Sequence, residues 1–236
     1  MKDIVDLTVT QIRIYPVDAL PFADLRLTPS IKAIKEAFHF ANVQPDLLGG
    51  QLIFNSGTIE SRGKIVNILN LTIDPRRIQI QARARSAAVD TFYNSLTKVL
   101  ESATKQAHAG PIQPLVKAEE TSCVAILDID FDQLIAPALV SFLQGEGKSK
   151  LRTEYGEPRS IAFKSLSFEI KYAPASPTIE EHDVVLMNKM LTIEPRQSTP
   201  LRERRFFTLS PTDSETHLSI LQALEKVVAK GKEKAK

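Results

Sequence analysis

Arginine and glutamine side chains alternate with small aliphatic ones along residues 77–85, and this is the clearest chemical pattern in the sequence. The polar positions are Arg77, Gln79, Gln81, Arg83 and Arg85, with isoleucine or alanine at each position between them. Because successive side chains of a strand point to opposite faces, the polar set should share one face. Guanidinium groups pair bidentately with phosphates or carboxylates and stack on planar rings. The pattern therefore predicts a sheet face that can bind nucleic acid or an acidic partner.

A second arginine-rich segment lies in the C-terminal half. Its arginines, which Phe206 and Phe207 follow directly, are Arg196, Arg202, Arg204 and Arg205. Bases stack on aromatic rings and on guanidinium planes, so the recurrence in both halves favours a binding face. A solvated antiparallel face, with Glu203 and other acids balancing the charge, explains the same residues. The formal net charge of only +2 also lacks the strong positive field that by itself indicates nucleic acid.

Three carboxylates alternate with apolar residues near the middle of the chain. Asp128, Asp130 and Asp132 have Leu127, Ile129 and Phe131 as their neighbours, at the end of a predicted strand. Carboxylates gathered on one side of a strand end can hold Mg²⁺ or Mn²⁺, as a nuclease or a phosphotransfer enzyme requires. The same spacing also occurs on exposed strand ends, where aspartate stops pairing. A metal-dependent enzyme is therefore an alternative hypothesis.

The remaining nucleophiles and metal ligands form no catalytic motif. The four histidines, which lack the paired spacing of metal ligands, are His39, His108, His182 and His217. There is no glycine-rich phosphate loop, GxSxG elbow or CxxC pair. Cys123 is the only cysteine, and its apolar run predicts a small buried side chain rather than a reactive thiol. We therefore expect no cofactor, and the sequence leans away from an enzyme.

A six-residue segment occurs twice and suggests an internal duplication. Residues 71–76 read LTIDPR and residues 191–196 read LTIEPR. A strand-like apolar run precedes each copy, and a long amphipathic helix that opens with serine follows each. The repeated polar side chains are those of Thr72, Asp74 and Arg76 and of Thr192, Glu194 and Arg196. We expect the acid and the arginine to pair across the turn or across a pseudo-twofold axis, with two equivalent binding spots as the alternative.

The first predicted unit covers residues 1–108. Residues 4–15 alternate as a strand whose phase slips near Thr10 and Gln11, which predicts a bulge or a bend there. A helix should begin with Thr28 as its N-cap and Pro29 in its first turn. Strands are expected over 51–56, 64–73 and 77–85, with turns at Ser56-Gly57 and Asp74-Pro75. Ser86 should cap a helix that extends to about residue 106, and residues 109–120 read as a linker.

The second predicted unit covers residues 121–236, although the two units can also form one continuous domain. Strands are expected over 122–131, 151–155, 160–172, 182–193 and 202–209, with a short helix from Pro137. A long C-terminal helix should open at Ser210-Pro211, and its buried stripe is Leu218, Leu221, Leu224 and Val228. The order of elements in both units predicts an α+β fold with antiparallel sheets backed by helices and pseudo-twofold symmetry.

These observations lead to one functional interpretation and several alternatives. A composition of 43% hydrophobic and 25% charged residues is typical of a soluble globular protein, and no apolar run is long enough to span a membrane. We therefore expect a cytoplasmic, non-enzymatic binding or assembly protein, with no membrane partner. It would bind a protein partner, or act as a subunit of a complex, through a sheet surface or an inter-unit groove. The alternatives are a nucleic-acid-binding module, the metal-dependent enzyme, and a carrier of an apolar ligand between sheet and helices.

Overall fold

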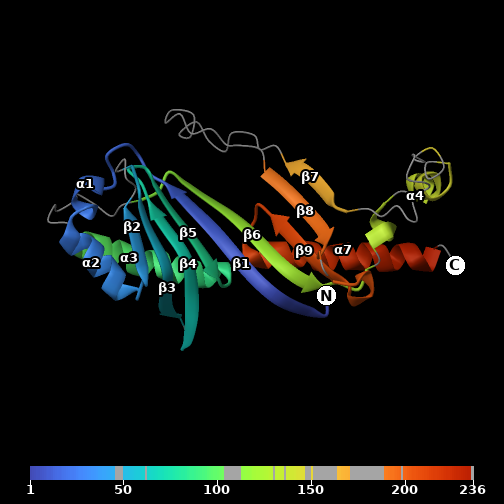
Figure 1. Cartoon of the computed structure of the whole chain (residues 1–236), viewed down its shortest axis with the longest axis horizontal. Coiled ribbons are helices and arrows are strands. Elements are labelled where there is room, and N and C mark those ends of the chain that lie inside the picture. The colour runs from blue at the N-terminus through green and yellow to red at the C-terminus, as the bar shows by residue number, and fades with distance from the viewer. Residues whose placement is uncertain are drawn as a thin grey trace.

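A nine-stranded antiparallel sheet backed by helices forms the body of the protein in the computed structural model (Figure 1). The structure describes residues 1–45, 50–61, 63–103, 113–129, 131–135, 137–146, 150, 164–170, 189–197 and 199–234. The sheet order is β2-β3-β4-β5-β1-β6-β9-β8-β7. The expected α+β class is thus confirmed. The strand expected over 151–155, the ends of the one expected over 160–172 and residues 182–188 of the one expected over 182–193 lie outside the described residues, as do His108 and His182.

The elements of the N-terminal half follow one another closely along the chain. They are β1 (Asp3–Ile14), α1 (Phe22–Leu25), α2 (Thr28–Ala37), β2 (Asn42–Pro45), β3 (Leu52–Ser61), β4 (Lys64–Ile73), β5 (Arg77–Arg83) and α3 (Ser86–Ala103). Those of the C-terminal half are β6 (Val116–Ile126), η1 (Phe131–Leu134), α4 (Pro137–Gln144), β7 (Leu166–Ile170), β8 (Lys189–Pro195), η2 (Leu201–Glu203), β9 (Arg205–Ser210) and α7 (Ser214–Lys234).

Strands β1 and β6 join the two halves of the sheet at its centre. They pair along their whole length, from Asp3 opposite Ile126 to Ile14 opposite Val116. Residues 116–120, which we expected within a linker, therefore belong to β6. The two prolines of the expected linker, Pro111 and Pro114, precede this segment. Residues 116–120 contain no proline, so each can take part in regular pairing with β1.

The bulge predicted in β1 is misplaced. The register of β1 against β6 shifts between Ile4 and Asp6, whereas pairing is continuous through Thr10 and Gln11. The side chain of Gln11 points to the helix side and is fully buried. What looked like a slip of phase is a buried polar residue in a regular strand.

The turn predicted at Ser56-Gly57 is also wrong, because β3 continues through both residues. Ser56 has a left-handed backbone conformation with φ of 57°, which bends the strand without ending it. Gly57 lies against the ring of Phe40, and a Cβ atom there would come within 2.5 Å of two ring carbons. Glycine at this position serves close packing rather than chain reversal.

Three element boundaries in the C-terminal half differ from expectation. The strand expected over 122–131 ends at Ile126, although Leu127, Ile129 and Phe131 remain buried. The strand expected from residue 202 begins at Arg205, because η2 and the left-handed Arg204 precede it. The last helix begins at Ser214, since residues up to 210 still pair with β6.

The helices α2, α3 and α7 lie on one side of the sheet and cover two apolar cores (Figure 1). Under α2 and α3, aromatic rings make the closest contacts: the ring centroids of Phe38 and Phe92 are 4.5 Å apart, and those of Phe40 and Phe54 are 5.3 Å apart. Under α7, the expected stripe is present, with Leu218, Leu221 and Val228 buried against β6 and β9. The two cores therefore bury most of the apolar side chains on the helix side of the sheet.

The two long helices meet at their N-termini beneath the central strands. The backbone N–H of Ser86 donates to Oγ of Ser214 at 3.0 Å, and the N–H of Ser214 donates to Oγ of Ser86 at 2.8 Å. Each serine thus accepts one of the unpaired N–H groups at the start of the other helix. Sequence reasoning expected a cap at Ser86, but not that the partner would be a helix 128 residues away.

Candidate functional site

The side of the sheet that faces away from α2, α3 and α7 is the candidate binding surface, and we call it the open face. No helix in the described part of the chain lies across it (Figure 1). Strand registers place on it Arg77, Gln79, Gln81 and Arg83 of β5, Ile12 and Ile14 of β1, Val116 and Ala118 of β6, and Arg205, Phe207 and Leu209 of β9.

The alternation predicted for β5 is present. Ile78, Ile80 and Ala82 are buried on the helix side, so their polar neighbours face outward. The strand ends at Arg83, however, and Arg85 lies beyond it in the approach to α3. There Arg85 is 3.9 Å from the carboxylate of Glu215 on α7, so this side chain is not part of the open face.

Of the second arginine segment, Arg205 lies within a strand of the open face. Arg205 lies opposite Ile126 at the start of β9. Arg202 lies in η2, and Arg204 follows it with φ of 53°. Arg196 is exposed immediately after β8. The backbone N–H of Arg196 donates to the carbonyl of Arg205 at 2.8 Å, so the structure brings these two arginines side by side, while Arg202 lies apart in η2.

Three arginines of the open face form ion pairs with carboxylates of the same chain. Arg77 Nε is 2.9 Å from Asp74, and Arg83 Nε is 4.0 Å from Asp6. Arg205 Nε is 3.1 Å from Glu203. Exposed pairs of this kind contribute little stability, but they cancel the local positive charge. The open face therefore offers paired charges rather than a bare cationic stripe.

Apolar side chains lie on the open face at one end of the central strand pair. Ile12 lies opposite Ala118, and Ile14 lies opposite Val116, in the central pair of strands. All four are only half-buried. Phe207 and Leu209 of β9 form a second apolar area on the same face, with Glu120 and Ser122 of β6 between them and Ala118. Apolar areas bordered by polar side chains are the arrangement found in protein–protein interfaces.

The repeated hexamer forms a strand end and a turn. Thr72 Oγ1 donates to Asn70 Oδ1 at 2.8 Å. In the turn that follows, the carboxylate of Asp74 accepts from the backbone N–H of Arg76 and from Nε of Arg77, both at 2.9 Å. In the second copy, the hydroxyls of Thr192 and Ser167 are 3.2 Å apart. These contacts stabilise local structure in both places.

The aspartate series does not assemble a metal centre in the described part of the chain. Asp128 is exposed; its carboxylate pairs with Arg204 and lies 3.9 Å from Lys2. Asp130 lies outside the described residues, and Asp132 lies in η1, where only its backbone is described. Among the described residues, no group of three or more histidine, cysteine, aspartate or glutamate side chains is placed to hold a metal ion.

A half-buried polar cluster that sequence reasoning missed lies under the central strands. Gln11 Nε2 donates to Asp90 at 3.1 Å and to Glu119 at 3.3 Å, while Arg13 and Lys117 also bind Asp90, at 3.1 and 2.9 Å. Burial raises the pKa of Asp90, but hydrogen bonds from Lys117 and Gln11 and the nearby positive charges outweigh burial and hold its pKa below the usual value. The cluster fixes the register of β1, β6 and α3 around one carboxylate.

Tyr93 completes this cluster from α3. Its hydroxyl donates to the carbonyl oxygens of Gln11 and Ile78, at 3.1 and 2.8 Å, and the Arg13 guanidinium lies 3.8 Å from its ring centroid. Burial raises the pKa of Tyr93 well above its usual value. The signal in the sequence was the polar type of residues 11 and 13, which follow Leu7 and Val9 at the inward positions of β1.

A second buried polar cluster joins β6, β9 and α7. Thr208 Oγ1 is 2.8 Å from Nε2 of His217, and Ser210 Oγ is 2.6 Å from Nδ1. Cys123 Sγ lies 3.4 Å from the same Nε2, and burial raises the pKa of this thiol. Burial lowers the pKa of His217 from 6.5 to about 4. A neutral imidazole and a protonated thiol without solvent access stabilise the core and are poorly suited to nucleophilic chemistry.

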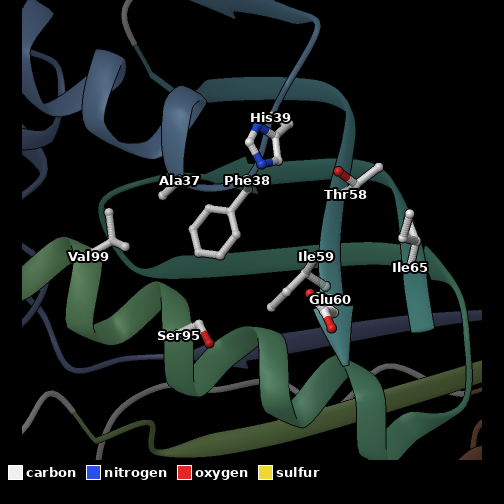
Figure 2. A pocket seen from close by; sticks show the side chains of 9 residues that line it. All are labelled: Ala37, Phe38, His39, Thr58, Ile59, Glu60, Ile65, Ser95 and Val99. Carbon is white, nitrogen blue, oxygen red and sulfur yellow. The ribbon is translucent and has the colours of Figure 1, made fainter. Parts of the chain in front are cut away.

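A hollow of about 540 Å³ lies at the edge of the sheet, between the end of α2, the C-terminal half of α3 and the β3–β4 hairpin (Figure 2). Phe38, Ile59 and Val99 give it an apolar wall, and His39 and Glu60 stand at its rim. The hollow is open to one side rather than enclosed between sheet and helices. It therefore differs from the closed cavity that a carrier of apolar ligands would need.

Comparison with protein-family models gives no match, and comparison with curated proteins gives none either. Among the helices of the described residues, none combines the length and the apolar character that crossing a membrane requires. What the chain binds is therefore inferred from its surface.

Proposed function

We propose that this chain is a non-enzymatic binding or assembly protein whose open face docks a protein partner. The observation that carries the proposal is that no helix of the described residues covers this face of the sheet, where Ile12, Ile14, Val116 and Ala118 of the central strands are half-buried. Apolar side chains on such a face gain from being covered by a partner. The other side of the same sheet already has its helices.

The charges on this face favour a protein over a polyanion. The guanidinium groups of Arg77, Arg83 and Arg205 each have a carboxylate within 4.0 Å. A phosphate backbone would have to compete with these carboxylates, whereas a protein rim of mixed charge would not. Gln79 and Gln81 add neutral hydrogen-bonding groups beside the apolar side chains of this face.

We also infer that the chain arose by duplication of one unit. The strand order supports this inference, since β1-β5-β4-β3 on one side of the centre corresponds to β6-β9-β8-β7 on the other. Each half ends in a long helix, and the repeated hexamer falls at the end of β4 and of β8. An experimental structure in which the four strands and the last helix of each half superpose would agree with it; different strand curvature or helix placement would not.

The docking proposal is tested with two matched lysine variants and affinity capture from the native host. Phe207→Lys changes the open face, and Val227→Lys changes the helix side at a residue that is 67% exposed on α7. We expect a protein partner that the parent and Val227→Lys retain and Phe207→Lys loses, while circular dichroism shows all three folded. A partner retained equally by all three chains contradicts the proposal, as does the absence of any retained protein.

Nucleic-acid binding is the second candidate, because Arg83 and Arg205 do share the open face with Gln79 and Gln81. The test is fluorescence anisotropy with labelled single- and double-stranded oligonucleotides at about 50 and 200 mM salt. This candidate predicts salt-sensitive binding that Arg83→Glu combined with Arg205→Glu abolishes. Binding that survives the double substitution removes it. The metal-dependent enzyme stays a prediction, for which the test is Mn²⁺ binding at millimolar concentration.

A further inference from the structure

The outer edge of β3 is covered along only part of its length. β2 pairs with Leu52–Asn55, and two further bonds continue the cover: Ala41 N–H to the Ser56 carbonyl at 3.1 Å and Thr58 N–H to the Phe38 carbonyl at 2.8 Å. Beyond Thr58, the described partners of β3 lie on β4 alone, with Glu60 opposite Ile65. Backbone groups alternate in direction along a strand. Because Thr58 N–H points outward, the N–H and C=O of Glu60 also point away from β4.

The hollow in Figure 2 runs along this same edge. Three consecutive residues, Thr58, Ile59 and Glu60, line it. Consecutive side chains of a strand point to opposite faces, so a hollow bordered by all three follows the edge of the strand rather than one face. On the helix side its wall is apolar, and on the other side Ile65 is 77% exposed. An exposed strand edge next to an apolar hollow is suited to an extended segment.

The charge at this edge limits what can occupy it. Glu60 is exposed at the rim, and none of the ion pairs between described residues includes it. Like charges placed directly opposite each other on neighbouring strands are destabilising. If the same edge of a second copy paired with this one, two Glu60 carboxylates would come together and repel each other. Charged side chains on edge strands prevent self-association in this way. A partner strand with a basic side chain opposite Glu60 has the complementary charge.

We propose that the β3 edge at Thr58–Ser61 binds an extended peptide segment that adds a strand to the sheet. Its backbone would bond to the N–H and C=O of Glu60. Side chains opposite Ile59 and Ser61 would point to the helix side and be apolar, filling the hollow beside Phe38 and Val99. The side chain between them would be lysine or arginine, opposite Glu60. This site is separate from the open face and does not depend on a partner there.

Selection of random heptapeptides displayed on phage tests the proposal, with the full chain as the target. Enriched peptides should contain an apolar–basic–apolar triplet. Glu60→Pro removes the outward N–H and leaves the bonds to β4 in place, since proline is tolerated on edge strands. Loss of one backbone hydrogen bond should weaken the enriched peptides about tenfold. Glu60→Thr is the matched control: it keeps the N–H, so binding should persist while the preference for a basic residue disappears.

A second variant and a direct readout separate loss of binding from loss of folding. Ser95→Phe fills the hollow from α3 without touching the backbone of β3, and it should also abolish binding. Amide hydrogen exchange of the parent with an enriched peptide should slow at Glu60. Peptides that bind the parent, Glu60→Pro and Ser95→Phe equally would overturn the proposal. So would failure to enrich any peptide, or slowed exchange on the open face instead.

Discussion

The buried imidazole of His217 should make the stability of the fold depend on pH. The ring lies between two hydroxyls, those of Thr208 and Ser210, each of which can donate to or accept from a neutral imidazole. Its side chain is fully buried, with no carboxylate among its hydrogen-bond partners. Burial therefore favours the neutral form and lowers the pKa from 6.5 to about 4.

The magnitude follows from linkage between protonation and folding. Between pH 6.5 and about 4 the unfolded chain binds a proton at this residue and the folded chain does not. Stability is therefore complete above 6.5, falls as the pH drops, and loses about 3 kcal/mol in all once the pH passes below the folded value. Between about pH 7 and pH 5 the loss is about 2 kcal/mol.

The assay compares the parent with His217→Gln, which keeps polar groups near Thr208 and Ser210 but does not titrate. Urea unfolding, followed by circular dichroism, gives the free energy of unfolding at about pH 7, 6 and 5. The advantage of the parent should shrink by about 2 kcal/mol over this range. His39→Asn, at an exposed turn with φ of 50°, is the control and should follow the parent. An advantage that stays constant with pH would refute the reasoning.

Three further substitutions test the packing of the sheet against its helices by urea unfolding. Gly57→Ala should cost about 1–3 kcal/mol, because the new methyl group would overlap the Phe40 ring; an unchanged stability would mean that this ring can move aside. Tyr93→Phe should cost about 1–2 kcal/mol by removing a buried hydroxyl that donates to two carbonyl groups. Ser214→Ala should cost about 1–2 kcal/mol because Ser86 N–H loses its acceptor, and a neutral result would show that water replaces it.

The sequence predicted strands well where one face is uniformly apolar. In β5, three aliphatic residues alternate with polar ones, and the structure buries Ile78, Ile80 and Ala82 as expected. In β1, the inward positions change from Leu7 and Val9 to Gln11, which binds Asp90 of α3. A pattern of hydrophobicity has no means of recognising a buried polar residue whose partner lies 79 positions away. The bulge was therefore placed where the chemistry changed, rather than where the register shifts.

Much of the candidate binding surface depended on contacts that the sequence does not reveal. The arginines of residues 196–205 looked like a counterpart of the β5 row, but Arg202 lies in η2 and the left-handed Arg204 follows it, so β9 begins only at Arg205. The acids that neutralise the arginines are local in sequence for Arg77 and distant for Arg83, whose partner is Asp6. The charge balance at a surface depends on which strands become neighbours. The composition of the chain gives only its total net charge.

By itself the sequence determined the α+β class, the two long helices, the buried stripe of the second of them, and the alternation of β5, because short-range periodicity encodes each of them. Only the tertiary structure decided that one sheet runs through both halves by pairing β1 with β6, and that Ser86 and Ser214 cap each other's helices. It also decided which face of the sheet the helices of the described residues leave open. These features depend on partners more than a hundred residues apart, and such contacts form only when cooperative packing of the whole chain offsets the entropy of bringing them together.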